Sequence, residues 1–204
     1  MTVNKNSALS CVGLLLACVA ATIVCAAISV WPKTRTPPVD TLDLLLDLSV
    51  FPNEWDLCLG PAPLPKRERG ERESLCASFC PQDFEGTGGT YQEVYRYRNA
   101  LDAAILFQLE FSGRAFPKWH MTSPWKVPEE LAYESSVADR FKLACGEVDV
   151  PGRHWKCKAV AQYDEYISVF VTHLSPEDMT LQDVERILAA IDERMALYLG
   201  KDTQ

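Results

Sequence analysis

Two tryptophans and a histidine gather in a proline-containing stretch near the middle of the chain. Trp119, His120 and Trp125 all lie between Gly113 and Pro128. Exposed tryptophans on a stiff loop can stack on a sugar, contact a partner protein or sit at a membrane interface. We therefore take Trp119, His120 and Trp125 as the candidate ligand or partner surface. The alternative is that both tryptophans fold back over an open sheet edge.

Cysteine is the second residue type that could form covalent bonds or bind a metal. Cys145 and Cys157 share the parity of the apolar residues in two successive alternating segments. If these segments form a hairpin, the two sulfurs face each other and a disulfide is expected. One alternative is a zinc site formed by Cys145, Cys157 and His154. The other is that both cysteines are free thiols. Successive strand residues point to opposite faces, so an odd spacing would turn His154 away from Cys157, and we expect no metal.

Three further cysteines, Cys58, Cys76 and Cys80, follow the apolar N-terminal run. An odd set leaves one thiol over, so we expect a second disulfide from Cys58 to either Cys76 or Cys80, and the sequence does not choose between them. Disulfides persist in oxidising compartments, which places the bulk of the chain on the extracytoplasmic side of a membrane.

The chain matches no common catalytic or cofactor-binding motif. It has no nucleophile elbow, no zinc-protease helix, no haem attachment motif and no phosphate-binding loop. Nothing in the sequence positions a base for Ser135 or Ser136, and the neighbouring carboxylates of Asp164 and Glu165 would point to opposite faces. We therefore assign no catalytic residue and no cofactor.

An uncharged apolar run, residues 8–30, opens the chain. Roughly 23 residues of helix cross one bilayer, so residues 1–31 are predicted to be a transmembrane anchor that contacts membrane lipid through residues 8–30, with Trp31 at the interface. Cleavage as a signal peptide and lipidation at Cys18 are the alternatives. The apolar core of a signal peptide is normally shorter than this run.

The part of the chain beyond the anchor is acidic. Lys5 is the only charged side chain before Pro32, so 19 basic and 28 acidic residues follow it, a formal charge of −9. Such a surface repels phosphate backbones, and nucleic acid is excluded as an expected partner.

Residues 32–80 are predicted to be a proline-rich and charged linker. Its prolines from Pro32 to Pro38 disfavour a helix, and a short juxtamembrane helix follows over residues 40–48. The leucine-rich side of that helix must be covered, either by the domain itself or by the membrane or a partner subunit. Residues 60–65, rich in proline, are expected to form an exposed loop.

Residues 81–204 are predicted to form an α+β domain. Alternation predicts a strand over residues 91–98, a short strand at 131–133 and an antiparallel meander over 137–174, whose last strand is apolar on both sides and therefore central. We expect this antiparallel sheet to be covered on one face by two helices.

Capping residues mark both helices. Asn99 begins the first, whose expected buried face is Leu101, Ala104, Ile105, Gln108 and Leu109. Thr180 and Asp183 form a capping box at the start of the second helix, Leu181–Leu199, which Gly200 ends.

We therefore expect a single-pass membrane protein with one extracytoplasmic binding or assembly domain. The leading hypothesis is an accessory subunit of a larger membrane or envelope complex, with other membrane or envelope proteins as partners. The alternatives are a free-standing tethered receptor for a small molecule or polysaccharide, and an envelope hydrolase.

Overall fold

The computed structural model of the chain describes residues 38–65, 70–82, 89–111, 116, 121–150 and 153–200. All of them belong to one compact unit, Thr34–Gln204. The other unit, Met1–Lys33, lies outside the described residues, and with it the apolar run expected to cross the membrane. Within the described ranges no helix is both long and apolar enough to span a bilayer.

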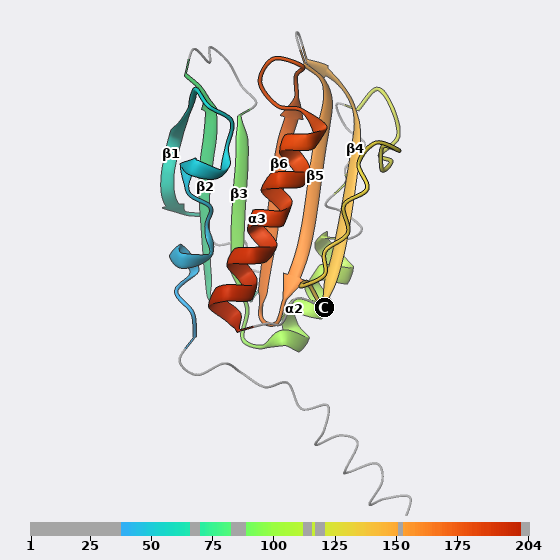
Figure 1. Cartoon of the computed structure of the whole chain (residues 1–204). Helices are drawn as coiled ribbons and strands as arrows, with labels where there is room; N and C mark the ends of the chain where they lie inside the picture. The colour runs from blue at the N-terminus through green and yellow to red at the C-terminus, as the bar shows by residue number, and fades with distance from the viewer. Residues whose placement is uncertain are drawn as a thin grey trace, which may run out of the picture. The chain divides into compact units, whose positions relative to one another are not determined.

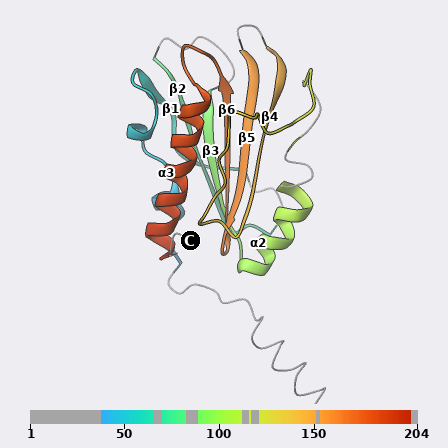
Figure 2. The ribbon, with the colours of Figure 1, turned by 45° about the vertical axis from the view of Figure 1, so that its right-hand side comes forward.

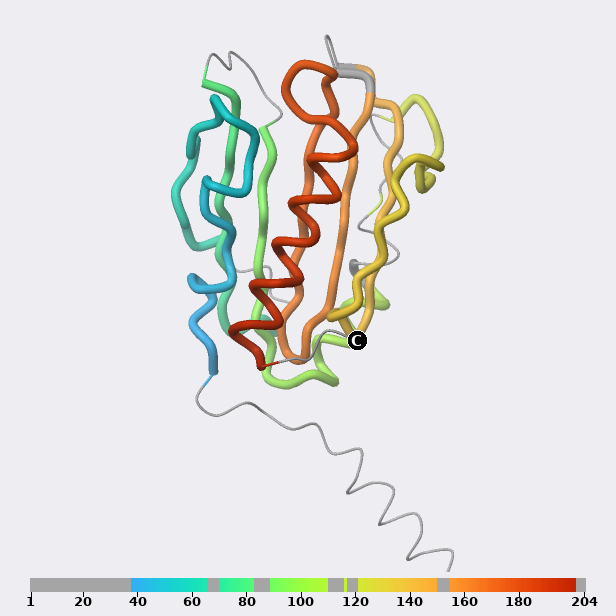
Figure 3. Tube along the Cα trace, viewed as in Figure 1, coloured from blue at the N-terminus to red at the C-terminus, as the bar shows by residue number. Residues whose placement is uncertain are grey.

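A six-stranded antiparallel sheet forms the centre of the unit, with the strand order β1-β2-β3-β6-β5-β4 (Figure 1). The strands are β1 (Trp55–Pro63), β2 (Glu73–Pro81), β3 (Thr90–Arg96), β4 (Arg140–Val150), β5 (Arg153–Tyr163) and β6 (Tyr166–Leu174). The chain forms two three-stranded meanders, which can be followed along the tube in Figure 3 and which join where β3 pairs with β6. The fold class is α+β, as expected.

The first meander uses residues that the sequence assigned to a linker. β1 and nearly all of β2 lie before residue 81, and the proline-rich residues 60–63, expected as part of a loop, belong to β1. β1 is an edge strand whose pairing with β2 shifts register between Leu57 and Leu59 and again between Leu59 and Ala62. Proline lacks an N–H donor, and an edge strand is where a sheet accommodates it.

The second meander matches the sequence pattern closely. β4, β5 and β6 cover the predicted 137–174 region, and β6 pairs on one side with β3 and on the other with β5. Asp164 makes the β5–β6 turn with a φ of 52°, a left-handed conformation that aspartate tolerates. Residues 131–133, expected as a short strand, lie instead outside any strand and contact α3.

The two helices cover opposite faces of the sheet, which corrects the expectation that they share one (Figure 2). α3 (Leu181–Leu199) packs in a cluster with Val94 and Phe170, and α2 (Ala100–Leu106) packs in a second cluster with Tyr95 and Val169. The central strands β3 and β6 bury side chains on both sides, so both faces of the sheet need cover.

The ends of α3 follow the predicted capping chemistry. The Thr180 hydroxyl accepts a hydrogen bond from the backbone N–H of Asp183 (3.2 Å), and the Asp183 carboxylate accepts one from the N–H of Thr180 (3.0 Å). Gly200 ends the helix at φ 59°, where a side chain would be strained.

α2 begins as expected but turns a different side to the sheet. Asn99 caps it by accepting a hydrogen bond from the N–H of Asp102 (2.9 Å), and a π-helical turn continues it. Ala103 and Phe107 are buried, whereas Leu101 and Ile105, expected inside, are exposed. The helix is apolar on two sides, and the large Phe107 ring with the small Ala103 fills the second cluster on the sheet better than the aliphatic stripe.

Candidate functional site

Residues 38–51, called the N-terminal strap below, lie beside α3 on one face of the sheet (Figure 1). The strap consists of two 3-10 turns, η1 (Thr41–Leu44) and η2 (Leu48–Val50), in place of the single helix expected over this stretch. Asp40 and Asp47 cap these turns by accepting hydrogen bonds from backbone N–H groups two residues on. Such local hydrogen bonds compete with a continuous helix.

Three consecutive leucines carry the strap into the hydrophobic core. Leu44, Leu45 and Leu46 are buried, together with Phe51, whereas Leu42 is exposed. In a helix, three successive side chains point in widely different directions, so one packed face cannot bury them all. A strap enclosed by the sheet and α3 can bury all three. The leucine-rich segment therefore packs on its own domain, which was one of the two alternatives left open by the sequence.

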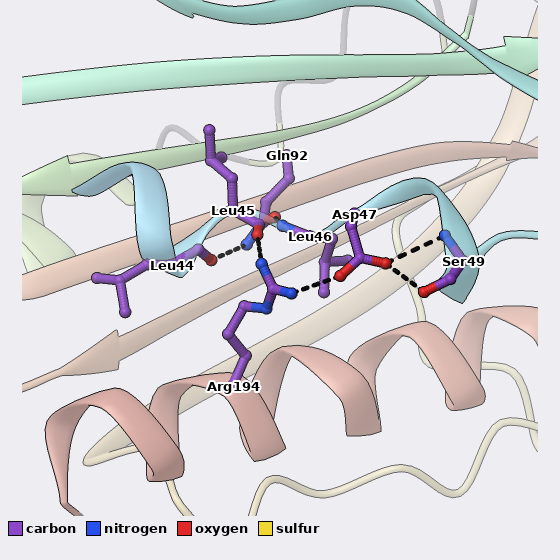
Figure 4. A network of polar contacts seen from close by, with 7 residues as sticks. All are labelled: Leu44, Leu45, Leu46, Asp47, Ser49, Gln92 and Arg194. Atoms are coloured by element: carbon purple, nitrogen blue, oxygen red, sulfur yellow. Dashed lines mark hydrogen bonds and ion pairs between the residues drawn. The ribbon is translucent and has the colours of Figure 1, made fainter. Parts of the chain in front are cut away.

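A buried glutamine on β3 holds the backbone of the strap (Figure 4). The Gln92 carbonyl oxygen accepts a hydrogen bond from the Leu46 N–H (2.7 Å), and its amide nitrogen donates to the Leu44 carbonyl (3.3 Å) and to the Ser168 hydroxyl (3.2 Å). Gln92 is fully buried, so it satisfies backbone groups that would otherwise lack water.

Arg194 on α3 holds the same strap from the other side (Figure 4). Its guanidinium donates to the Leu45 carbonyl and pairs with the Asp47 carboxylate at 2.5 Å. Hydrogen bonds from Ser49, aided by the Arg194 charge, hold the pKa of Asp47 below its ordinary value, although partial burial acts to raise it. Strand and helix thus both fix the strap to the domain.

The beginning of the strap lies at the end of the sheet that carries the β5–β6 turn. The Tyr166 hydroxyl donates to the Val39 carbonyl at 2.8 Å, and the Thr41 hydroxyl donates to the Glu73 carboxylate at 2.6 Å. The chain is therefore part of the folded domain from Val39 onward, and we call this end the strap-proximal end.

The candidate aromatic surface is only partly within the described residues. Trp119 and His120 lie outside them, and Trp125 is half-buried against Phe116, with ring centroids 5.3 Å apart in an edge-to-face arrangement. The neighbouring Lys126 exchanges two backbone hydrogen bonds of 2.8 Å with Cys145 on β4. The described part of the loop thus lies along the open β4 edge. Because Trp119 and His120 lie outside the described residues, the choice between an exposed aromatic surface and two tryptophans folded over the edge stays open.

Two disulfides join cysteines of neighbouring strands among the described residues. Cys145 and Cys157 occupy directly opposite positions on β4 and β5 and are joined, the pairing expected from their shared parity. Cys58 pairs with Cys80, which decides the choice that the sequence left open. Among the described residues no group of three or more histidine, cysteine, aspartate or glutamate side chains could hold a metal ion.

Cys76 remains a free thiol on β2. Burial, with a smaller contribution from the Glu93 charge, raises the pKa of Cys76 to about 11. The nucleophile of cysteine chemistry is the thiolate, so this thiol is held in its unreactive form at neutral pH.

A buried carboxylate on α3, Asp192, holds residues 131–138 against the helix, and no sequence pattern had singled it out. Asp192 accepts hydrogen bonds from Tyr163 (2.6 Å), Tyr133 (2.7 Å) and Ser135 (2.9 Å). Burial, and then the negative charge of Asp192, raise the pKa of Tyr163 well above its ordinary value. Ser135, considered above as a nucleophile, also accepts from the Ala138 N–H (2.9 Å), so its contacts are those of a structural turn.

Exposed apolar side chains gather at several places on the described residues, and two of these groups lie on α2 and on β1. On α2 and the turn that follows it, Leu101, Ile105 and Leu109 are 50%, 48% and 63% exposed and recur every four residues along one side; we call them the α2 stripe. On the edge strand β1, Leu57 and Leu59 are 46% and 52% exposed. The periodicity predicts Leu101, Ile105 and Leu109 on the buried side of the helix, and this prediction is wrong because the tertiary packing turns them outward.

The two larger of the surface cavities considered are lined by described residues. One of about 180 Å³ lies between the start of β1 and the acidic residues Glu177 and Asp178, and one of about 220 Å³ lies beside Leu64 and Arg72. Both are smaller than the sites of roughly 300–1,000 Å³ that enclose drug-sized ligands. Neither includes Trp125.

In comparisons with known proteins, no family model matches the chain, and no curated protein or solved structure matches it significantly.

Proposed function

We propose that this chain is a membrane-anchored extracytoplasmic domain that assembles with other membrane or envelope proteins as an accessory subunit of a larger complex. The observation that carries this proposal is the exposed edge strand β1, where Leu57 and Leu59 face solvent on the outermost strand of the sheet.

Sheet edges in soluble proteins are usually protected by charges, bulges or prolines, because an open edge can pair with another chain. β1 is protected only in part. Its second half contains Pro61 and Pro63. Its first half, Trp55–Gly60, has a register shift between Leu57 and Leu59 but no proline, and Asp56 is its single charge. A disulfide from Cys58 fixes this half to β2, so a partner would meet a preformed surface. We infer that Trp55–Gly60 is the contact segment.

The N-terminal strap supports the same function. Because the chain joins the domain at Val39, only eight residues separate it from Val30, the last residue of the apolar run predicted to contact membrane lipid. A domain on so short a tether meets partners at the membrane surface. The two disulfides support an oxidising compartment and therefore the extracytoplasmic side.

The experiment is to solubilise the full-length protein from native membranes in mild detergent and to measure the mass of the native complex, with crosslinking to identify what travels with it. We expect a stable companion that crosslinks near β1. The double variant Leu57→Gln/Leu59→Gln should lose this companion, because it removes apolar contact area without disturbing the core. Leu197→Gln, on the exposed side of α3, is the matched control and should keep it.

A protein that runs alone under these conditions would contradict the assembly proposal. The receptor for a small molecule or polysaccharide would then be the function to test, beginning with the loop that contains Trp119, His120 and Trp125. A companion retained by the double variant would contradict the assignment to β1 while leaving assembly intact.

A further inference from the structure

The α2 stripe lies at the strap-proximal end of the sheet. The β5–β6 hairpin at this end contacts the start of α2 through the Gln162 amide, which donates to the Ala100 carbonyl at 3.0 Å. The same hairpin holds the beginning of the strap through the hydrogen bond from Tyr166 to Val39. Figures 1 and 2 show α2 and the start of the strap at one end of the domain. The stripe and the point where the tether begins therefore lie at the same end of the domain, on opposite faces of the sheet.

The tether is too short to carry this end far from the membrane. The eight residues from Trp31 to Pro38 span at most about 30 Å when fully extended, at roughly 3.3–3.6 Å per residue. If residues 8–30 cross the bilayer as proposed, the strap-proximal end stays within that distance of the hydrocarbon boundary.

The stripe has the chemistry of an interfacial contact. Leu101, Ile105 and Leu109 are all aliphatic, and on the opposite side of the helix Ala103 and Phe107 hold α2 to the sheet. A short helix with one apolar side toward the protein and another toward the outside can lie in the interface between headgroups and acyl chains.

Because the domain is tethered, even this small apolar surface can be sufficient for membrane contact. Three half-exposed side chains would not hold a free domain on a membrane, but a short linker raises the effective concentration of the surface, so that a weak contact becomes populated. The part of the chain beyond the anchor has a formal charge of −9 by sequence, and this charge would repel anionic lipid. The proposed contact is therefore apolar and does not require anionic lipid.

We propose that the α2 stripe rests in the interfacial layer of the bilayer that anchors the chain, so that the strap-proximal end faces the membrane and the opposite end of the sheet faces away from it. The proposal rests on the anchored function above and adds the orientation of the domain. It leaves the first half of β1 available to partners, since Leu57 pairs with Phe79 and Phe79 with Thr90, at the end of β3 opposite Arg96 and the β5–β6 turn.

The test places a benzophenone amino acid at position 105 of the full-length protein, reconstituted in nanodiscs that contain only phosphatidylcholine. Position 57 is the matched control, because Leu57 is exposed to the same extent as Ile105 (46% against 48%). A probe at position 15, within the predicted anchor, reports whether the chain is inserted. After illumination, we expect several-fold more lipid adduct by mass spectrometry at position 105 than at position 57, and a probe at position 101 should repeat the result.

Equal lipid labelling at positions 105 and 57, with strong labelling at position 15, would overturn the proposal while leaving the anchor intact. No labelling at position 15 would overturn the anchor and both proposals with it. In native membranes, a protein adduct at position 105 in place of lipid would overturn the lipid contact and assign the stripe to assembly.

Discussion

Replacing Gln92 by leucine should loosen the N-terminal strap. The substitution keeps the side chain close in size but leaves the Leu46 N–H and the Leu44 carbonyl without their buried partner, and it removes a hydrogen bond to Ser168. An unsatisfied buried polar group costs about 1–3 kcal/mol, and the added apolar contact offsets part of this. We expect a loss of about 2–4 kcal/mol in the free energy of unfolding.

The assay is thermal unfolding of the full-length protein in detergent, followed by near-ultraviolet circular dichroism with the disulfides intact. In a domain of this size each kcal/mol shifts the midpoint by roughly 2–4 °C, so the midpoint should fall by about 5–15 °C. Hydrogen exchange should also become faster across the strap before it changes in β5 and β6. Gln182→Leu, at an exposed position in the first turn of α3, is the control and should leave both readouts unchanged.

An unchanged midpoint for Gln92→Leu would refute the reasoning. So would a lowered midpoint with unchanged exchange in the strap, because the loss would then arise elsewhere in the sheet and not in the contact that fixes the tether.

Three further outcomes follow from the described contacts. Replacing Cys145 and Cys157 by serine opens a loop with a sequence separation of 12, and should lower the free energy of unfolding in urea by roughly 2–3 kcal/mol. Cys76, with its pKa raised to about 11, should react slowly with iodoacetamide at pH 8 when native and quickly when unfolded, as read by peptide mass mapping; equal rates would contradict the protection that its partial burial provides. Tyr163→Phe removes a hydrogen bond to Asp192 and should flatten the alkaline loss of stability. The raised pKa of Tyr163 means that its contribution is complete below about pH 10, the ordinary tyrosine value, and is lost as pH rises above it. Urea unfolding at pH 8 and pH 11 checks this, and an equal loss of stability in both proteins would contradict it.

The sequence alone determined the elements whose signals are local. Alternation located the β4–β6 meander, and the shared parity of Cys145 and Cys157 predicted their disulfide. The Thr180 capping box located the start of α3, and Gly200 its end. These features depend on residues close together in the chain or on a period that one secondary structure imposes, so they can be recognised without knowledge of the rest of the fold.

Only the tertiary structure decided how apolar surfaces were distributed among competing contacts. α2 offers two apolar sides, and the space on the sheet selected Ala103 and Phe107 over the stripe. The leucines of the strap are buried because Gln92 and Arg194, far away in sequence, hold their backbone. Cys80 was chosen over Cys76 as the partner of Cys58 by the pairing register of β1 with β2. Each of these outcomes depends on which parts of the chain, far apart in sequence, pack together. Local periodicity indicates that a side chain is apolar but not which residues will cover it.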